Sequence, residues 1–235
     1  MFLALSRTAE AVVSVVETLH RVPLFAQLGP DDLQRVASLT RERPYPRNSV
    51  IVFEDDPGDA LFVVAAGQVK VVLVGEDGRE VILAVLGPGD FFGELALIDD
   101  EPRSAHVIAM DDARLLVLRR DDFQQVLEAH PRIALGLLRA LSRRLRRADD
   151  KIGALVLLDV YGRVARVLLE LAADGPSGDL VQGVTHATMA QMIGSSRETV
   201  SRTLSELADR GLIAVSRDGI RLADRAALRA AARLS

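Results

Sequence analysis

A heptad repeat near the middle of the chain constrains its fold most. Seven apolar residues follow one another at alternating spacings of four and three: Ala134, Leu138, Leu141, Leu145, Ala148, Ile152 and Leu155. A period of about 3.5 residues predicts one long helix with a coiled-coil seam. Charged residues flank this seam, Arg143, Arg144, Arg146 and Arg147 among them. A narrow seam between polar flanks favours the pairing of two chains; the alternative is packing against the helix's own domain.

Short runs rich in β-branched residues precede the long helix. They predict strands at Val50–Phe53, Leu61–Ala66, Val69–Val74, Val81–Leu86 and Ala113–Leu118. Turn signals such as Asp56-Pro57-Gly58-Asp59 separate the runs. Many short strands at regular spacing are typical of a jelly roll or a barrel. A short helix should follow, capped by Asp121 or Asp122 and ended by His130-Pro131.

More helices are expected after the seam. The long helix should end or hinge at Leu158-Asp159-Val160, and another helix should run to a loop at residues 174–179. Thr185 can cap a helix that ends at Gly194, and Ser195 or Ser196 can cap the next one. Two short helices, a further helical run to Arg210 and a hairpin that turns at 217–219 complete the prediction.

Composition excludes several classes of site. The 235 residues carry a net charge of −4, but residues 186–235 hold eight Arg against five acidic residues, as a basic DNA-binding end would. The chain has no cysteine, and its four histidines lack metal-ligand spacing, so neither a thiolate site nor a metal site is expected; a haem sensor remains open. No catalytic motif is present, so no enzyme and no cofactor are expected. No apolar run approaches the ~20 residues of a membrane span, and the start lacks a signal-peptide pattern, so a cytoplasmic location without membrane contact is expected.

The helix after Gly194 carries the chemistry of a DNA-reading surface. Arg197, Glu198 and Arg202 share a polar face. Arginine can donate two hydrogen bonds to guanine O6 and N7, and glutamate can accept one from cytosine N4. Helix, tight glycine turn and helix is the layout of a helix-turn-helix. The alternative is a solvated face on which Glu198 and Arg202 form an ion pair at i,i+4.

A second motif supplies the groups that a cyclic nucleotide needs. Phe92-Gly93-Glu94-Leu95-Ala96-Leu97 is followed by Pro102-Arg103-Ser104-Ala105. Arg103 offers a bidentate fork to a phosphate, and Ser104 adds a neutral donor. Glu94 can accept from a ribose 2′-OH, and Gly93 lets the backbone approach closely. The alternative is a surface ion pair between Glu94 and Arg103.

These motifs resemble those of the CRP/FNR family of transcription regulators. The run from Gly194 to Arg202 is similar to the family's recognition helix, and Leu158–Ala165 to its interdomain region. The similarity extends from about Leu24 to Leu222. It implies an α+β protein with a cyclic-nucleotide-binding β-roll (jelly roll), a long dimerisation helix and a winged helix-turn-helix. The implied domains are 1–130 (N-terminal helix plus β-roll), 131–159 (dimerisation helix) and 160–235 (DNA-binding).

The resemblance assigns residues to two sites. The implied ligand site consists of Gly93, Glu94, Leu95, Ala96, Arg103, Ser104, Arg144 and Asp149. The implied DNA site has three base-reading residues, Arg197, Glu198 and Arg202. Around them lie the backbone-positioning donors and a residue of the same helix: Ser195, Ser196, Thr199, Arg217 and Ser201. TGTGA-like palindromic half-sites are implied, and His186 and Ala187 depart from the family's more polar helix start.

The base of the nucleotide stays open. In cAMP receptors a Thr-Ser pair on the long helix meets the base, and the matching residues here are Ala148 and Asp149. Ala148 cannot hydrogen-bond a base, whereas Asp149 can accept from adenine N6, or from guanine N1–H and N2–H together. The resemblance favours cAMP, then cGMP, with cyclic di-GMP third.

The resulting hypothesis is a homodimer that binds double-stranded DNA and a cyclic nucleotide, with RNA polymerase as a further partner. The nucleotide would shift a pre-existing equilibrium of the long helices and bring both recognition helices to one-turn spacing. One alternative is a constitutive regulator with a vestigial pocket. Another is a cyclic-nucleotide module that has lost DNA binding, against which the intact set of Arg197, Glu198 and Arg202 argues.

Overall fold

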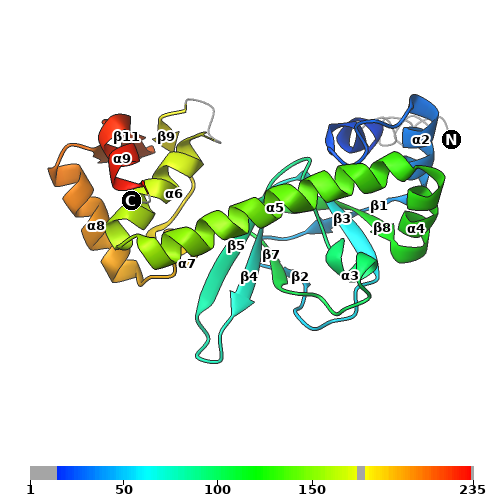
Figure 1. Cartoon of the computed structure of the whole chain (residues 1–235), viewed down its shortest axis with the longest axis horizontal. Helices are drawn as coiled ribbons and strands as arrows, with labels where there is room; N and C mark the ends of the chain where they lie inside the picture. Colours follow the sequence, from blue (N-terminus) through cyan, green and yellow to red (C-terminus); the bar gives the residue numbers. More distant parts are fainter. Residues whose placement is uncertain (1–14, 174–177, 234–235) are drawn as a thin grey trace. The chain divides into compact units, whose positions relative to one another are not determined.

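The computed structural model describes residues 15–173 and 178–233. Their internal contacts divide them into two compact units: residues up to 78 with 83–144, and residues 79–82 with those from 145 onward (Figure 1). The first unit is built on two β-sheets, and the second is a small helical unit with a three-stranded sheet. Each unit has a hydrophobic core of its own.

Two four-stranded sheets form the β-roll of the first unit, with strand orders β1-β8-β3-β6 and β2-β7-β4-β5. The strands are β1 (Arg41–Tyr45), β2 (Val50–Val52), β3 (Ala60–Ala66), β4 (Val69–Val74), β5 (Glu80–Leu86), β6 (Phe91–Phe92), β7 (His106–Ala109) and β8 (Ala113–Arg119). The pairs β1–β8, β3–β8, β3–β6, β2–β7 and β4–β7 are antiparallel. The predicted α+β class with a jelly-roll sensor is confirmed.

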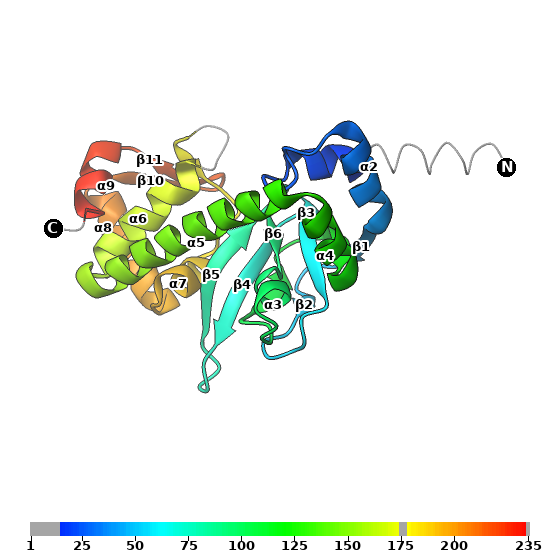
Figure 2. The ribbon, with the colours of Figure 1, turned by 45° about the vertical axis from the view of Figure 1, so that its right-hand side comes forward.

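Strand β3 shows why the roll has two cores. Successive side chains of a strand point to opposite faces. Leu61 and Val63 face a core shared with the helices, whereas Phe62 and Val64 face the interior between the sheets. The helices of this unit are a helical segment at 15–21, α2 (Pro30–Leu39), α3 (Leu95–Ile98), α4 (Arg120–Ala129) and the first part of α5 (Figure 2). The rest of the predicted N-terminal helix lies outside the described residues.

Some elements of the β-roll were not predicted. Strand β1 is an edge strand with Pro44 and three charged residues, a sequence that lacks the β-branched pattern but that an edge tolerates. The elements β6, β7 and α3 are four residues long or shorter. The predicted cap of α4 was wrong: Arg119 is the N-cap, without a side-chain hydrogen bond. Asp121 and Asp122 instead occupy the first turn, where their charge suits the helix dipole.

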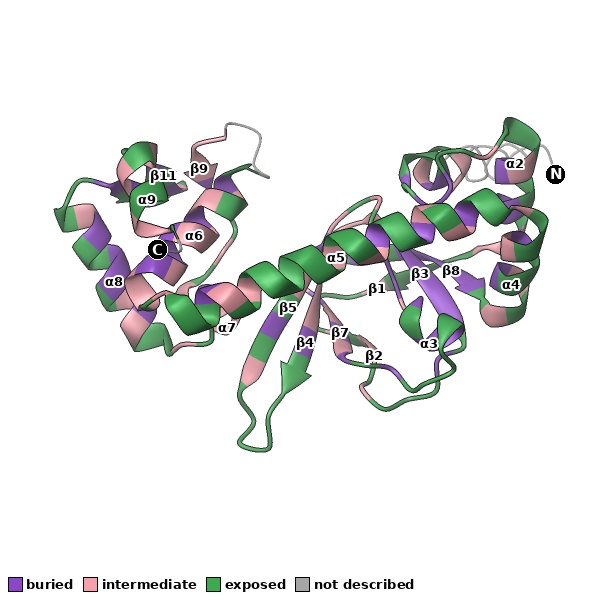
Figure 3. Cartoon of the chain, viewed as in Figure 1, coloured by how far each residue is buried: buried purple, intermediate pink, exposed green. Residues whose placement is uncertain are grey.

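Helix α5 (Pro131–Leu157) contains the heptad seam. Another stripe of the helix, Ile133, Leu137 and Ala140, is buried in the core of the first unit. The seam itself is largely uncovered: Leu138, Leu145, Ile152 and Leu155 are 60%, 64%, 60% and 50% exposed (Figure 3). The alternative that the seam packs on its own domain is therefore wrong for these residues.

The second unit contains α6 (Val160–Ala173), β9 (Leu180–Val181), α7 (His186–Ile193), α8 (Arg197–Asp209), β10 (Ile213–Ser216), β11 (Gly219–Leu222) and α9 (Arg225–Ala231). The break before α6 lies at the predicted place, where Asp159 Oδ1 accepts from the Gly162 N–H at 2.8 Å. The separate helical run predicted up to Arg210 is wrong, because Val200, Leu204 and Leu207 form one buried stripe on a single helix.

Two short elements of this unit lacked a sequence prediction. Strand β9 pairs with β11 and makes the hairpin a three-stranded sheet. Helix α9 is capped by Asp224, and its Leu228 is fully buried in the core of the unit. The C-terminal segment is thus part of this core. Within the described residues, no helix combines the length and the apolar composition needed to cross a membrane.

Candidate ligand and DNA-binding sites

The loop after α3 carries Arg103 into the β-roll. Its backbone is held on both sides, because the Arg103 N–H donates to Asp56 O and the Asp55 N–H donates to Arg103 O, each at 2.9 Å. Its guanidinium donates to Gly93 O and Ala60 O, both at 2.9 Å, and the side chain is only 5% exposed. Burial lowers the pKa of Arg103, which shows how poorly its charge is solvated. A buried cation of this kind suits an anionic ligand.

Gly93 fits this site because it has no side chain. Its φ of +86° is a conformation that glycine adopts freely. A Cβ there would lie 2.5 Å from Arg103 Nη1 and 2.9 Å from Ala60 O. Any larger residue would therefore displace the arginine that the motif analysis assigns to the phosphate.

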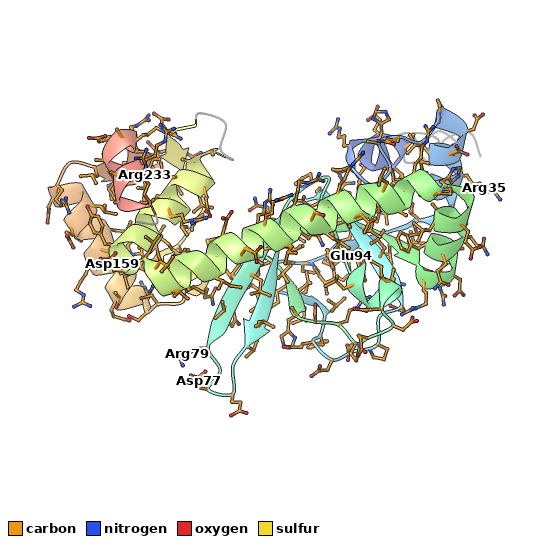
Figure 4. All side chains as sticks on the ribbon, viewed as in Figure 1. Arg35, Asp77, Arg79, Glu94, Asp159 and Arg233 are labelled. Carbon is orange, nitrogen blue, oxygen red and sulfur yellow. The ribbon has the colours of Figure 1, made fainter. Side chains whose placement is uncertain are left out.

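Glu94, which is labelled in Figure 4, is 1% exposed. Among the described residues, Arg144 of α5 is the only one that forms an ion pair with it. Arg144 donates to Glu94 Oε1 and to Phe91 O, and its guanidinium lies 4.7 Å from the centre of the Phe91 ring. The alternative, a surface ion pair between Glu94 and Arg103, is wrong, because Glu94 is buried and pairs with Arg144. Glu94 Oε2 is buried and has no hydrogen-bond partner among the described residues, so it can accept from a ligand hydroxyl.

The structure brings Gly93, Glu94, Arg103 and Arg144 together. Leu95 and Ala96 form the start of α3, where Leu95 is exposed and Ala96 is buried. Ser104 is exposed beside Arg103. Asp149 is exposed on α5, in the part of the helix that groups with the second unit. Its assignment to the ligand site stays a prediction.

Gly93, Glu94 and Arg103 lie on one segment, residues 92–105, which we call the cassette. Sequence reasoning missed Arg120, which holds the cassette in place. Its guanidinium donates to Gly58 O at 2.6 Å and to Ala96 O at 2.8 Å, and it pairs with Asp100. The loop between β2 and β3 lies so close to α3 that a Cβ on Gly58 would be 2.2 Å from Ala96 Cβ. The acceptors are backbone carbonyls 62 and 24 residues away, so no local pattern could have revealed this role.

The second unit contains the predicted helix-turn-helix. Thr185 caps α7 by accepting from the Thr188 N–H at 3.0 Å. Gly194 ends α7 in the left-handed conformation, with φ 63° and ψ 49°. Ser196, rather than Ser195, caps α8 by accepting from the Thr199 N–H at 3.1 Å. These caps fix where α8 begins, and therefore which side chains stand in its first turns.

The base-reading candidates lie free on α8. Arg197, Glu198 and Arg202 are exposed, and no ion pair joins Glu198 to Arg202 in the part of the chain that the structure describes. The Glu198 backbone N–H and the Ser196 hydroxyl favour the ionised carboxylate and lower the pKa of Glu198. The expected solvated ion pair at i,i+4 is thus absent, and Glu198 is kept as a charged acceptor.

Further groups surround these side chains. An open hollow of about 500 Å³ is lined by Thr185, His186, Ala187 and Arg197, at the N-terminal ends of α7 and α8. Because Ser216 pairs with Gly219, the turn between β10 and β11 has two residues. Arg217 is the first of them and is exposed. Ser195, Thr199 and Ser201 are half-buried at the start of α8. Helix, turn, helix and hairpin together match the winged form that the resemblance implied.

Comparison with known proteins matches both units. The family model "Cyclic nucleotide-binding domain" matches residues 42–130, and "Crp-like helix-turn-helix domain" matches residues 162–231. The cyclic AMP receptor protein of Thermus thermophilus is 40% identical over 81% of this chain and 88% of its own length. The CRP-like cAMP-activated global transcriptional regulator of Mycobacterium tuberculosis is 33% identical over 88% of this chain and 95% of its own.

A solved structure of a relative has the same fold. The c-di-GMP responsive global regulator CLP of Xanthomonas campestris is 27% identical, with a TM-score of 0.72. The match covers 83% of this chain and 99% of that one. Relatives of this fold thus carry names with two different cyclic-nucleotide ligands.

Proposed function

This chain belongs to the CRP/FNR family of cyclic-nucleotide-responsive, DNA-binding transcription regulators, which are not enzymes, and we propose that cAMP is its ligand. The observation that carries the proposal is the cluster of Gly93, Glu94, Arg103 and Arg144, in which Glu94 and Arg103 are buried. Arg103 would bind the cyclic phosphate in place of the Gly93 and Ala60 carbonyls. Glu94 Oε2, which is buried without a partner among the described residues, would accept from the ribose 2′-OH.

The number of cations in the cassette favours a mononucleotide over cyclic di-GMP, and the relatives favour adenine as its base. Arg144 is engaged with Glu94, which leaves Arg103 as the arginine that can turn to a phosphate. One bidentate arginine suits a mononucleotide with one phosphate better than cyclic di-GMP with two. The named cAMP relatives favour adenine over guanine. Asp149 is our candidate for accepting from adenine N6, and cGMP is the second candidate ligand.

We propose that the active form is a homodimer joined along α5. The exposed seam residues Leu138, Leu145, Ile152 and Leu155 would bury their apolar surface against a second copy. The dimer would place two copies of α8 on TGTGA-like half-sites related by two-fold symmetry. Nucleotide bound beside Arg144 would bias the arrangement of the α5 pair, and so the spacing of the recognition helices.

A titration tests the ligand and the allostery together. We expect cAMP to tighten binding to a fluorescent TGTGA palindrome by at least about tenfold, a coupling of ~1.4 kcal/mol, with a smaller effect of cGMP. Fluorescence anisotropy at fixed salt measures this, because the phosphate contribution changes steeply with salt. Equal affinity with and without nucleotide would favour the constitutive regulator instead. A response to cGMP or cyclic di-GMP alone would reject cAMP.

Replacing Glu198 tests the base contact. We expect Glu198→Ala to weaken binding to the TGTGA palindrome by about 1–3 kcal/mol and to relax the preference at one base pair of each half-site. The slope of log Kd against log salt should stay unchanged, because no phosphate contact is lost. Glu206→Ala, on the same helix but past its first turns, is the matched control. Unchanged discrimination among all four base pairs at each position would contradict the assigned role.

A further inference from the structure

A cavity of about 320 Å³ lies in the β-roll beside β1, β8 and the start of α4. Its lining includes five charged residues and one aromatic residue: Arg41, Arg43, Asp59, Arg119, Asp122 and Phe62. None of the described residues assigned above to the cyclic nucleotide lines it. A volume of this size lies at the lower end of the roughly 300–1,000 Å³ typical of small-molecule sites.

The sheet register explains how three arginines come to share this cavity. Arg41 and Arg43 are two residues apart on β1, so their side chains point to the same face. Arg41 lies opposite Val117 on β8, and Arg119 is two residues beyond Val117. Val117 and its β3 partner Phe62 belong to the interior core, so all three arginines stand on the inner face where that core ends.

The three guanidinium groups outnumber the two carboxylates, Asp59 and Asp122, that line the cavity with them. No hydrogen bond or ion pair joins any of them to another described residue, whereas Arg114 on the same strand pair is matched to Glu42 at 2.9 Å. Asp59 lies 3.8 Å from Arg103 instead, and Asp122 is in the first turn of α4. Like charges gathered on one sheet face repel one another, and an anion bound among them would relieve that repulsion.

We propose that this cavity binds a small phosphomonoester that also carries hydroxyl groups. Three arginines provide planar forks for the phosphate oxygens. Asp59 and Asp122 are acceptors, which a bare phosphate would not need but which sugar hydroxyls would use. Phe62, at the edge of the interior core, gives the cavity an apolar wall. The site is independent of which cyclic nucleotide the cassette takes.

The cavity borders the cassette but uses different binding groups. Arg103 donates to Ala60 O, lies 5.7 Å from the centre of the Phe62 ring and is the cation closest to Asp59. Both places offer a phosphorylated sugar a cation, so the test needs a variant of each. Arg103→Gln removes the cation of the cassette, and Arg41→Gln with Arg119→Gln removes two cations of the cavity.

Isothermal titration of the full chain with ribose 5-phosphate and with inorganic phosphate tests the proposal. We expect ribose 5-phosphate to bind with a Kd below about 1 mM, and at least about tenfold more tightly than inorganic phosphate. The Arg41→Gln, Arg119→Gln double variant should weaken it by about tenfold or more. The matched control Arg114→Gln should leave it unchanged, and Arg103→Gln should weaken it less than the double variant does. Circular dichroism verifies folding, and Arg41→Gln alone replaces the double variant if that one unfolds.

Three results would overturn the proposal. The first is the absence of ribose 5-phosphate binding. The second is binding that survives loss of the cavity arginines and disappears in Arg103→Gln, since the sugar phosphate would then occupy the cassette. The third is equal affinity for inorganic phosphate, which would deny the carboxylates any role in recognition.

Discussion

Arg103→Gln is expected to weaken cAMP binding by about 100-fold or more, roughly 3 kcal/mol, because a charge-assisted bidentate contact is lost in a buried site. Arg103 donates to the Gly93 and Ala60 carbonyls at 2.9 Å each. Glutamine has one amide in place of the guanidinium fork, so it can serve one of these carbonyls and carries no charge for the phosphate. Isothermal titration with cAMP measures the loss.

The same variant separates sensing from DNA reading. Without cAMP, Arg103→Gln should bind the TGTGA palindrome as weakly as the unliganded wild type, because α7 and α8 are untouched. Arg114→Gln is the matched control: its partner Glu42 is on the surface, and such pairs contribute little. Should Arg103→Gln respond to cAMP as the wild type does, the cassette would not be the sensor.

Leu145→Asp is expected to prevent the proposed dimer from forming and to weaken palindrome binding by about 100-fold or more. Leu145 is 64% exposed within one chain, so the substitution costs the isolated fold little. In a paired α5 it would place two carboxylates in an apolar seam, where burying unpaired charge is costly. Losing the dimer also loses the gain from binding two half-sites at once. Analytical ultracentrifugation and anisotropy follow the two effects.

Phe53→Asp is the matched control for this experiment. Phe53 is an apolar residue of the β-roll that is 52% exposed, and it lies outside the seam. It should leave both the dimer and the DNA affinity unchanged. A dimeric Leu145→Asp variant with wild-type affinity would show that the chains pair through another surface.

The helix-turn-helix was readable from the sequence because its signals are local. The caps at Thr185 and Ser196 and the left-handed Gly194 depend on neighbours within a few residues, and the structure places all three as caps or turn. The heptad seam was readable for the same reason, since helical periodicity is a property of one segment. The long strands of the β-roll were found, whereas the proline-containing edge strand β1 was not.

Partners that are distant along the chain were decided by the tertiary structure. The sequence left open an ion pair between Glu94 and Arg103, nine residues away, whereas in the fold Glu94 pairs with Arg144, fifty residues away on α5. Arg120 looked like an ordinary charged residue after a strand, and only folding brings it to the carbonyls of Gly58 and Ala96. The arginine-lined cavity likewise depends on the register of β1 against β8.

The sequence by itself thus determined the elements and the chemical groups: a seam, a recognition helix, and a cassette with one arginine and one glutamate. It determined them because propensity, capping and periodicity act over a few residues. The tertiary structure decided which charged side chains form ion pairs, as Glu94 does with Arg144, and which apolar stripe of α5 remains exposed. Burial and strand register are set by the whole packed chain, and no local pattern encodes them.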